Sequence, residues 1–214
     1  MPTSLQGKTV LVAGAGGPLV SALVSRLASE GAAVRLLQDD RTETSAHADP
    51  PMDLGRVDVL LNVILPIPAT SFLDLSQLDL CRFLPTTLGD SFRWSLAVGR
   101  SMALSDTHGM IVNVLGGPSH RSAGSSPFAP TLQQGCIVAF TQALAAELAD
   151  RQIQVNAVVG PSDDRERPAL HSEAESIIGA TLFLCATHGR AVNGEIVYVA
   201  GGSPMAYGSA AFPS

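Results

Sequence analysis

Short apolar runs alternate along the chain with longer stretches in which apolar residues recur at helical spacing. The runs at 9–13 and 57–63 are apolar at nearly every position, which is typical of strands covered on both faces of a parallel sheet. The pattern predicts strands over 9–13, 33–37, 57–63, 110–115, 153–159 and 196–199. It predicts helices over 19–29, 85–104, 131–149 and 173–185.

This alternation of strand and helix predicts one doubly wound, Rossmann-like domain over residues 1–214, with a parallel sheet between two helical layers (α/β/α). A chain of 214 residues is long enough to bury such a core. The polar stretch 39–55 contains Pro50 and Pro51 and is expected to be a loop. No internal repeat or linker divides the sequence.

Composition narrows the class of protein. The chain is 46% apolar and 15% charged, as in a globular protein, and its net charge of −6 comes without a basic stripe for nucleic acid. The apolar runs are too short to cross a bilayer and no signal peptide is evident, so we expect a cytoplasmic protein. Cys81, Cys136 and Cys185 lack metal-ligand spacing, so we expect reduced core thiols and no metal.

A series of segments resembles a known family in the same order and covers nearly the whole chain. The segments are 8–14, 57–62, 109–114, 140–148, 153–158 and 194–202. The first resembles the opening strand and glycine turn of the short-chain dehydrogenase/reductase family, and 140–148 resembles its long interface helix. The resemblance implies that family's fold, its NAD(P) cofactor and its assembly into oligomers.

The resemblance also implies a chemistry that this chain cannot supply in the usual way. The family's reaction uses a tyrosine and a lysine four residues further along a helix. The chain has one lysine, Lys8, and two tyrosines, Tyr198 and Tyr207, and these cannot form such a pair.

The positions matched to the family's catalytic residues carry other side chains. Alignment on 140–148 places Pro130 at the tyrosine position and Gln134 at the lysine position. Gly116 falls at the serine position and Thr87 at the asparagine position. Proline cannot transfer a proton, and glutamine carries no charge that would lower a neighbour's pKa. We therefore expect no catalytic group of the family's kind.

The glycine turn that would hold a dinucleotide is altered as well. Glycines let the backbone approach a pyrophosphate at a helix N-terminus, but Pro18 removes one N–H group and Val20 adds a branched side chain. Asp39 could bond a ribose, or it is a solvated loop carboxylate. We expect no tight NAD(P) binding, and the weak candidate contacts are Gly14, Gly16, Gly17, Asp39 and Asn62.

Two polar residues that follow predicted strands are weak candidates for a different chemistry. His120 follows the strand 110–115, and Asp163 follows the strand 153–159. Because ligands bind beyond the carboxyl ends of parallel strands, these residues could act as an acid and a base. The alternative is that both are solvated loop side chains.

The helices 85–104 and 131–149 carry apolar residues on more than one side, which predicts a partner besides the sheet. That partner is a second copy or another chain, such as an active short-chain dehydrogenase. Three hypotheses stay open. A non-catalytic subunit of such a complex is favoured, because all four catalytic positions differ. The others are a repurposed non-redox enzyme (a lyase, cyclase or isomerase) and a residual NAD(P)-dependent oxidoreductase.

Overall fold

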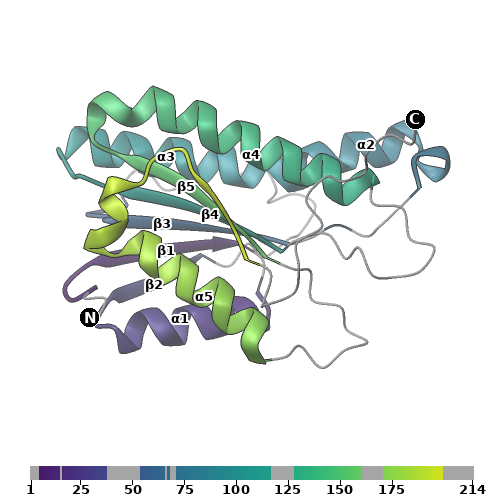
Figure 1. Ribbon diagram of the computed structural model, residues 1–214. Coiled ribbons are helices and arrows are strands. Elements are labelled where there is room, and N and C mark those ends of the chain that lie inside the picture. Colours follow the sequence, from purple (N-terminus) through teal and green to yellow (C-terminus); the bar gives the residue numbers. More distant parts are fainter. Residues whose placement is uncertain are drawn as a thin grey trace, which may run out of the picture.

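A parallel sheet forms the middle layer of the protein (Figure 1). The computed structural model describes residues 5–14, 16–37, 54–65, 67, 71–116, 128–160 and 171–199. Six strands pair in the order β2-β1-β3-β4-β5-β6, and every pairing is parallel. Their bounds are β1 Thr9–Gly14, β2 Ala33–Leu37, β3 Val59–Ile64, β4 Met110–Gly116, β5 Gln154–Gly160 and β6 Ile196–Tyr198. The predicted doubly wound sheet is confirmed, and the largest boundary difference is the start of β3.

Helices cover both faces of the sheet. They are α1 Pro18–Ser29, α2 Gln77–Leu84, α3 Asp90–Leu104, α4 Phe128–Leu148 and α5 His171–Cys185. Short turns add η1 Phe72–Asp74, η2 Pro85–Gly89, η3 Ala149–Arg151 and η4 Thr187–Ala191. Figure 1 shows α1 and α5 on one face and α3 and α4 on the other. The described residues thus form the three layers that the sequence predicts.

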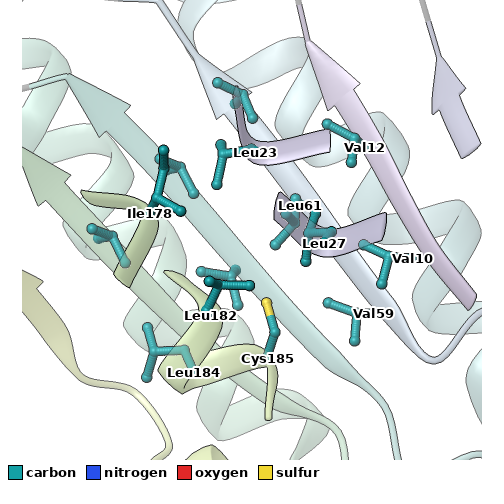
Figure 2. Close-up of a cluster of buried hydrophobic side chains, with 14 of the residues drawn as sticks. Val10, Val12, Leu23, Leu27, Val59, Leu61, Ile178, Leu182, Leu184 and Cys185 are labelled. Atoms are coloured by element: carbon teal, nitrogen blue, oxygen red, sulfur yellow. The ribbon is translucent and has the colours of Figure 1, made fainter. Parts of the chain in front are cut away.

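Each strand contributes side chains to the core on both faces of the sheet, because successive side chains point to opposite sides. Val10 and Val12 of β1 pack with α1 and α5, and Figure 2 shows them beside Leu23 and Leu27 of α1. Leu11 of β1, between these two valines, packs instead with residues of α3 and α4. This double burial explains why the strands are apolar at almost every position.

The helix predicted over 85–104 is present as the π-helical turn η2 followed by α3. The helix α2 that precedes it was not predicted, and Pro85 stands where α2 ends. Proline has no N–H to continue the helical hydrogen bonds, so a break at this residue is expected. The start of α2 is fixed by a capping box in which Ser76 and Asp79 bond each other's backbone N–H groups.

The prediction of three core thiols is also partly wrong. Cys185 is buried in the core that α5 forms with the sheet, but Cys136 is half-buried and Cys81 is exposed on α2. All three are free. The apolar neighbours of Cys81 in the sequence suggested a core position, whereas several apolar residues of the segment around α2, including Leu78, are themselves exposed.

Candidate functional site

The order of the strands locates the crevice where a ligand would bind. The chain runs from β1 outward to β2 and then returns to the other side of β1 as β3. In open α/β sheets, ligands bind beyond the carboxyl ends of the strands at such a reversal. The candidate site is therefore bounded by the segment after β1, which leads into α1, and by the segment after β3. Among the residues of the second segment, Leu65 and Ile67 are described.

The glycines after β1 have different roles. Gly14 has φ +143°, and a Cβ at this position would collide with the carbonyl oxygen of Val63 on the neighbouring strand. Gly14 is thus required for the close approach of β1 and β3. Gly17 is the N-cap of α1 with φ +151°, and a Cβ there would meet nothing within 4 Å. Gly16 is exposed, and Pro18 occupies the first helical turn, where its missing N–H is tolerated.

Asn62, a predicted cofactor contact, is buried and lies in a network of hydrogen bonds. Its Nδ2 donates to Ser95 Oγ of α3 at 3.0 Å and to Asn113 Oδ1 of β4 at 2.9 Å. Asn113 Nδ2 donates to Thr141 Oγ1 of α4 at 2.9 Å, and that hydroxyl donates to the carbonyl of Ile137. The network joins two strands to both helices of one layer.

The matched catalytic positions lie along one end of the sheet and its covering helices. Thr87 is in the π-helical turn η2, and Gly116 is the last residue of β4. Pro130 is buried in the first turn of α4, and Gln134 lies one turn later and is half-buried. Neither of the latter two side chains can ionise, so positions 130 and 134 offer no general acid or base.

The only lysine of the chain lies at the opposite edge of the sheet. Lys8 immediately precedes β1, and its Nζ is 3.4 Å from Asp58 Oδ1, whose side chain is 1% exposed. Tyr198 ends β6, and β3, β4 and β5 separate it from β1, which corresponds to about 19 Å at the usual strand spacing. Among the described residues, a tyrosine–lysine pair is therefore excluded by topology.

Asp58 anchors this amino-terminal edge. Its Oδ2 accepts the backbone N–H of Thr9 at 2.9 Å, and its Oδ1 accepts Arg56 Nη2 at 2.9 Å. Burial alone would raise the pKa of Asp58, but the hydrogen bonds from Arg56 and Thr9 outweigh it and hold the pKa below its usual value. Lys8 thus has a structural partner far from the candidate crevice.

Sequence reasoning missed a buried residue that bonds the segment after β3. Gln133 of α4 is 2% exposed, and its Oε1 accepts the backbone N–H of Ile67 at 3.1 Å. Its Nε2 donates to the backbone carbonyl of Leu65 at 2.9 Å. The signal was its place on the buried stripe of α4 with Ile137, Thr141 and Ala145, because a buried amide requires hydrogen-bond partners.

These residues fit a dinucleotide poorly. A dinucleotide spans the crevice and needs polar groups on both sides of the reversal. On the β1 side, α1 begins without a side-chain cap, so backbone N–H groups face that end. On the β3 side, the carbonyl of Leu65 and the N–H of Ile67 are bonded to Gln133. The described part of the crevice does not fit the whole cofactor.

Several expected features lie outside the described residues. They are His120, Asp163 and Asp39. Within the described ranges, no cluster of metal-ligating side chains is present. None of the helices in this part of the chain is long and apolar enough to cross a membrane.

Comparison with known proteins gives similarity over most of the chain. No protein-family model matches. The chain is 29% identical to the short-chain reductase protein NovJ of Streptomyces niveus, over 93% of this chain and 95% of that one. It is 28% identical to the dehydrogenase subunit BbsD of Thauera aromatica, over 71% and 66%. A solved short-chain dehydrogenase/reductase of Serratia marcescens has 25% identity and a TM-score of 0.73, covering 92% of this chain and 98% of that one.

Proposed function

Because the chain belongs to the short-chain dehydrogenase/reductase superfamily, we propose that it is a non-catalytic subunit that associates with a catalytically intact member. The observation that carries the proposal is the place of its only lysine. Lys8 is bonded to Asp58 at the amino-terminal edge of the sheet, whereas the chemistry of an α/β sheet takes place at the carboxyl edge. No rearrangement of a loop brings the residue that precedes β1 to that edge.

The surface of α3 and α4 supports association. Phe92 and Leu96, one turn apart on α3, are 53% and 39% exposed. The ring of Phe92 lies 6.4 Å from that of Phe140 on α4, so the two helices share one apolar surface. Exposed aromatic and leucine side chains of this kind are typical of protein–protein interfaces. The name of BbsD as a dehydrogenase subunit is compatible with such an assembly.

The test begins with the tagged chain, recovered from the cells that make it. The proposal expects a co-purifying short-chain dehydrogenase that carries a tyrosine–lysine pair. Both purified chains are then recombined, and the proposal expects a complex whose reductase activity or stability exceeds that of the partner alone. Recovery of this chain by itself, with turnover of its own, would contradict the proposal.

A matched pair of variants tests the surface. Phe92→Asp places a charge on the shared surface of α3 and α4 and should weaken the complex at least about tenfold. Leu104→Asp is the control, because Leu104 ends α3, is 90% exposed and lies off the Phe92 side of the helix. Equal effects of the two variants would contradict a specific contact through the surface around Phe92.

A second candidate is an NAD(P)-dependent oxidoreductase, and the comparisons by themselves favour it. The relatives NovJ and BbsD are named as a reductase and a dehydrogenase subunit, and NovJ is similar over 93% of this chain. This candidate needs a proton donor other than a tyrosine–lysine pair. Oxidation of NADPH or NADH by the purified chain alone, with a panel of ketone substrates, would establish it in place of the first candidate.

A further inference from the structure

One side chain ties the segment after β3 to the start of α4. The amide of Gln133 donates to the carbonyl of Leu65 and accepts from the N–H of Ile67. These two partners are separated by a single residue. A carboxamide that bonds a carbonyl and an N–H in this way uses both its donor and its acceptor. Gln133 itself is 2% exposed, so its amide depends on these two partners for its hydrogen bonds.

A second, independent contact holds the same two parts together. The ring of Phe72 in η1 meets the ring of Phe128, the first residue of α4, with centroids 5.0 Å apart and an edge-on angle of 63°. Edge-on contacts of this kind are favourable for aromatic pairs. The chain that follows β3 is thus fixed to the beginning of α4 at two points, by the Gln133 amide and by the Phe72–Phe128 pair.

The position of the Gln133 amide bears on whether a ligand can bind in the crevice. Leu65 and Ile67 follow β3 beyond its carboxyl end, on one side of the reversal between β1 and β3. A ligand in that crevice would use the backbone groups of this segment for hydrogen bonds. Gln133 already uses the N–H of Ile67 and one lone pair of the Leu65 carbonyl, so a ligand that needs the Ile67 N–H would have to displace the buried amide.

We propose that the crevice is closed on its β3 side by Gln133, which acts as an internal ligand, and that the chain does not take up a dinucleotide there. This inference rests on the proposed function as a non-catalytic subunit and deepens it. The fold then retains the crevice at the reversal between β1 and β3, but the crevice does not bind a cofactor. Gln133 is a positioning residue, because it acts through the backbone of the segment that it bonds.

Amide hydrogen exchange tests the internal contact directly. The N–H of Ile67 should be protected in the native chain and should exchange at least about tenfold faster in Gln133→Ala, since one hydrogen bond is lost. Gln134→Ala is the matched control, because it removes the neighbouring glutamine of the same helix, which is half-buried. Gln133→Met serves if the alanine variant does not fold, because it keeps the length of the side chain without its polar atoms.

Small amides provide a readout that a general loss of stability would not give. Acetamide should restore protection of the Ile67 N–H in Gln133→Ala and leave Gln134→Ala unchanged, because it can replace the missing carboxamide. Unchanged exchange at Ile67 in Gln133→Ala, or equal acceleration in both variants, would overturn the inference. So would a failure of acetamide at molar concentration to slow exchange in the folded alanine variant.

Titration of the native chain with NADPH and with NADH completes the test. The inference expects no saturable binding of either. Saturable binding without turnover would overturn the closure of the crevice and leave the subunit proposal standing. Turnover of the bound nucleotide by the chain alone would overturn both. Absence of binding, together with a homogeneous chain that never associates with another dehydrogenase, would support the closure and contradict the subunit proposal.

Discussion

Two buried threonines allow the polar network between sheet and helices to be measured. Thr141 of α4 and Thr181 of α5 are both fully buried, and each hydroxyl donates to the carbonyl four residues earlier, at 2.7 and 2.8 Å. Thr141 alone also accepts a hydrogen bond, from Asn113 Nδ2 at 2.9 Å. Substitution of each by valine therefore removes the same helical contact, but only Thr141→Val removes the link to β4.

The expected difference follows from the burial of Asn113, which is 0% exposed. Both variants lose the hydrogen bond from the threonine hydroxyl to a helix carbonyl, but that carbonyl keeps its backbone N–H donor. This loss costs about 0.5–1 kcal/mol in each variant. Thr141→Val also leaves a buried amide donor without that acceptor, which adds about 1–2 kcal/mol. Thr141→Val should therefore be the less stable variant by about 1.5 kcal/mol, or about 4 °C in Tm for a chain of this size.

Urea denaturation followed by circular dichroism gives both free energies of unfolding. A double-mutant cycle with Asn113→Leu then isolates the pair, and we expect a coupling of about 1 kcal/mol between positions 113 and 141. Equal destabilisation by Thr141→Val and Thr181→Val, with no coupling to Asn113, would refute the reasoning. It would mean that the network does not hold α4 on the sheet.

Two further predictions concern titratable groups. The lowered pKa of Asp58 means that its contribution to stability is present at neutral pH and is lost as the pH falls below about 4, so Asp58→Asn should unfold more easily at pH 7 and show a weaker acid dependence. An unchanged acid midpoint in that variant would contradict this. With a thiol reagent, exposed Cys81 should react first and half-buried Cys136 more slowly, whereas burial raises the pKa of Cys185 to about 12, so it should react only on unfolding. Reaction of Cys185 in the native chain would contradict the burial.

The strands could be predicted from the sequence because burial on both faces leaves a simple pattern. A run such as Val10, Leu11 and Val12 is apolar at every position, since alternate residues enter different halves of the core. The helix α2, which ends at Pro85, was not predicted, although a proline that follows a helical stretch marks the end of that helix. Its apolar residues gave no buried stripe to recognise, since Leu78 is exposed.

The contacts of the candidate site could not be predicted, because they join distant parts of the chain. Gln133 is separated from its two backbone partners by 66 and 68 residues. Its neighbour Gln134 has the same side chain and drew attention only because it matched the lysine position of a family. Periodicity places Gln133 on the buried face of α4, but it does not say which backbone groups will meet the amide.

On the proposal of a non-catalytic subunit, α4 is the helix in which the catalytic positions could change while the fold is kept. The buried stripe of α4 runs through Gln133, Ile137, Thr141 and Ala145, and these residues attach the helix to the sheet. Pro130 is accommodated in the first turn, where a missing N–H breaks no helical hydrogen bond, and Gln134 lies beside the stripe. Substitution at positions 130 and 134 therefore leaves the attachment of α4 intact. On the proposal of a non-catalytic subunit, selection on assembly alone would preserve the stripe and the outer surface of α4 and would leave these two positions free to change.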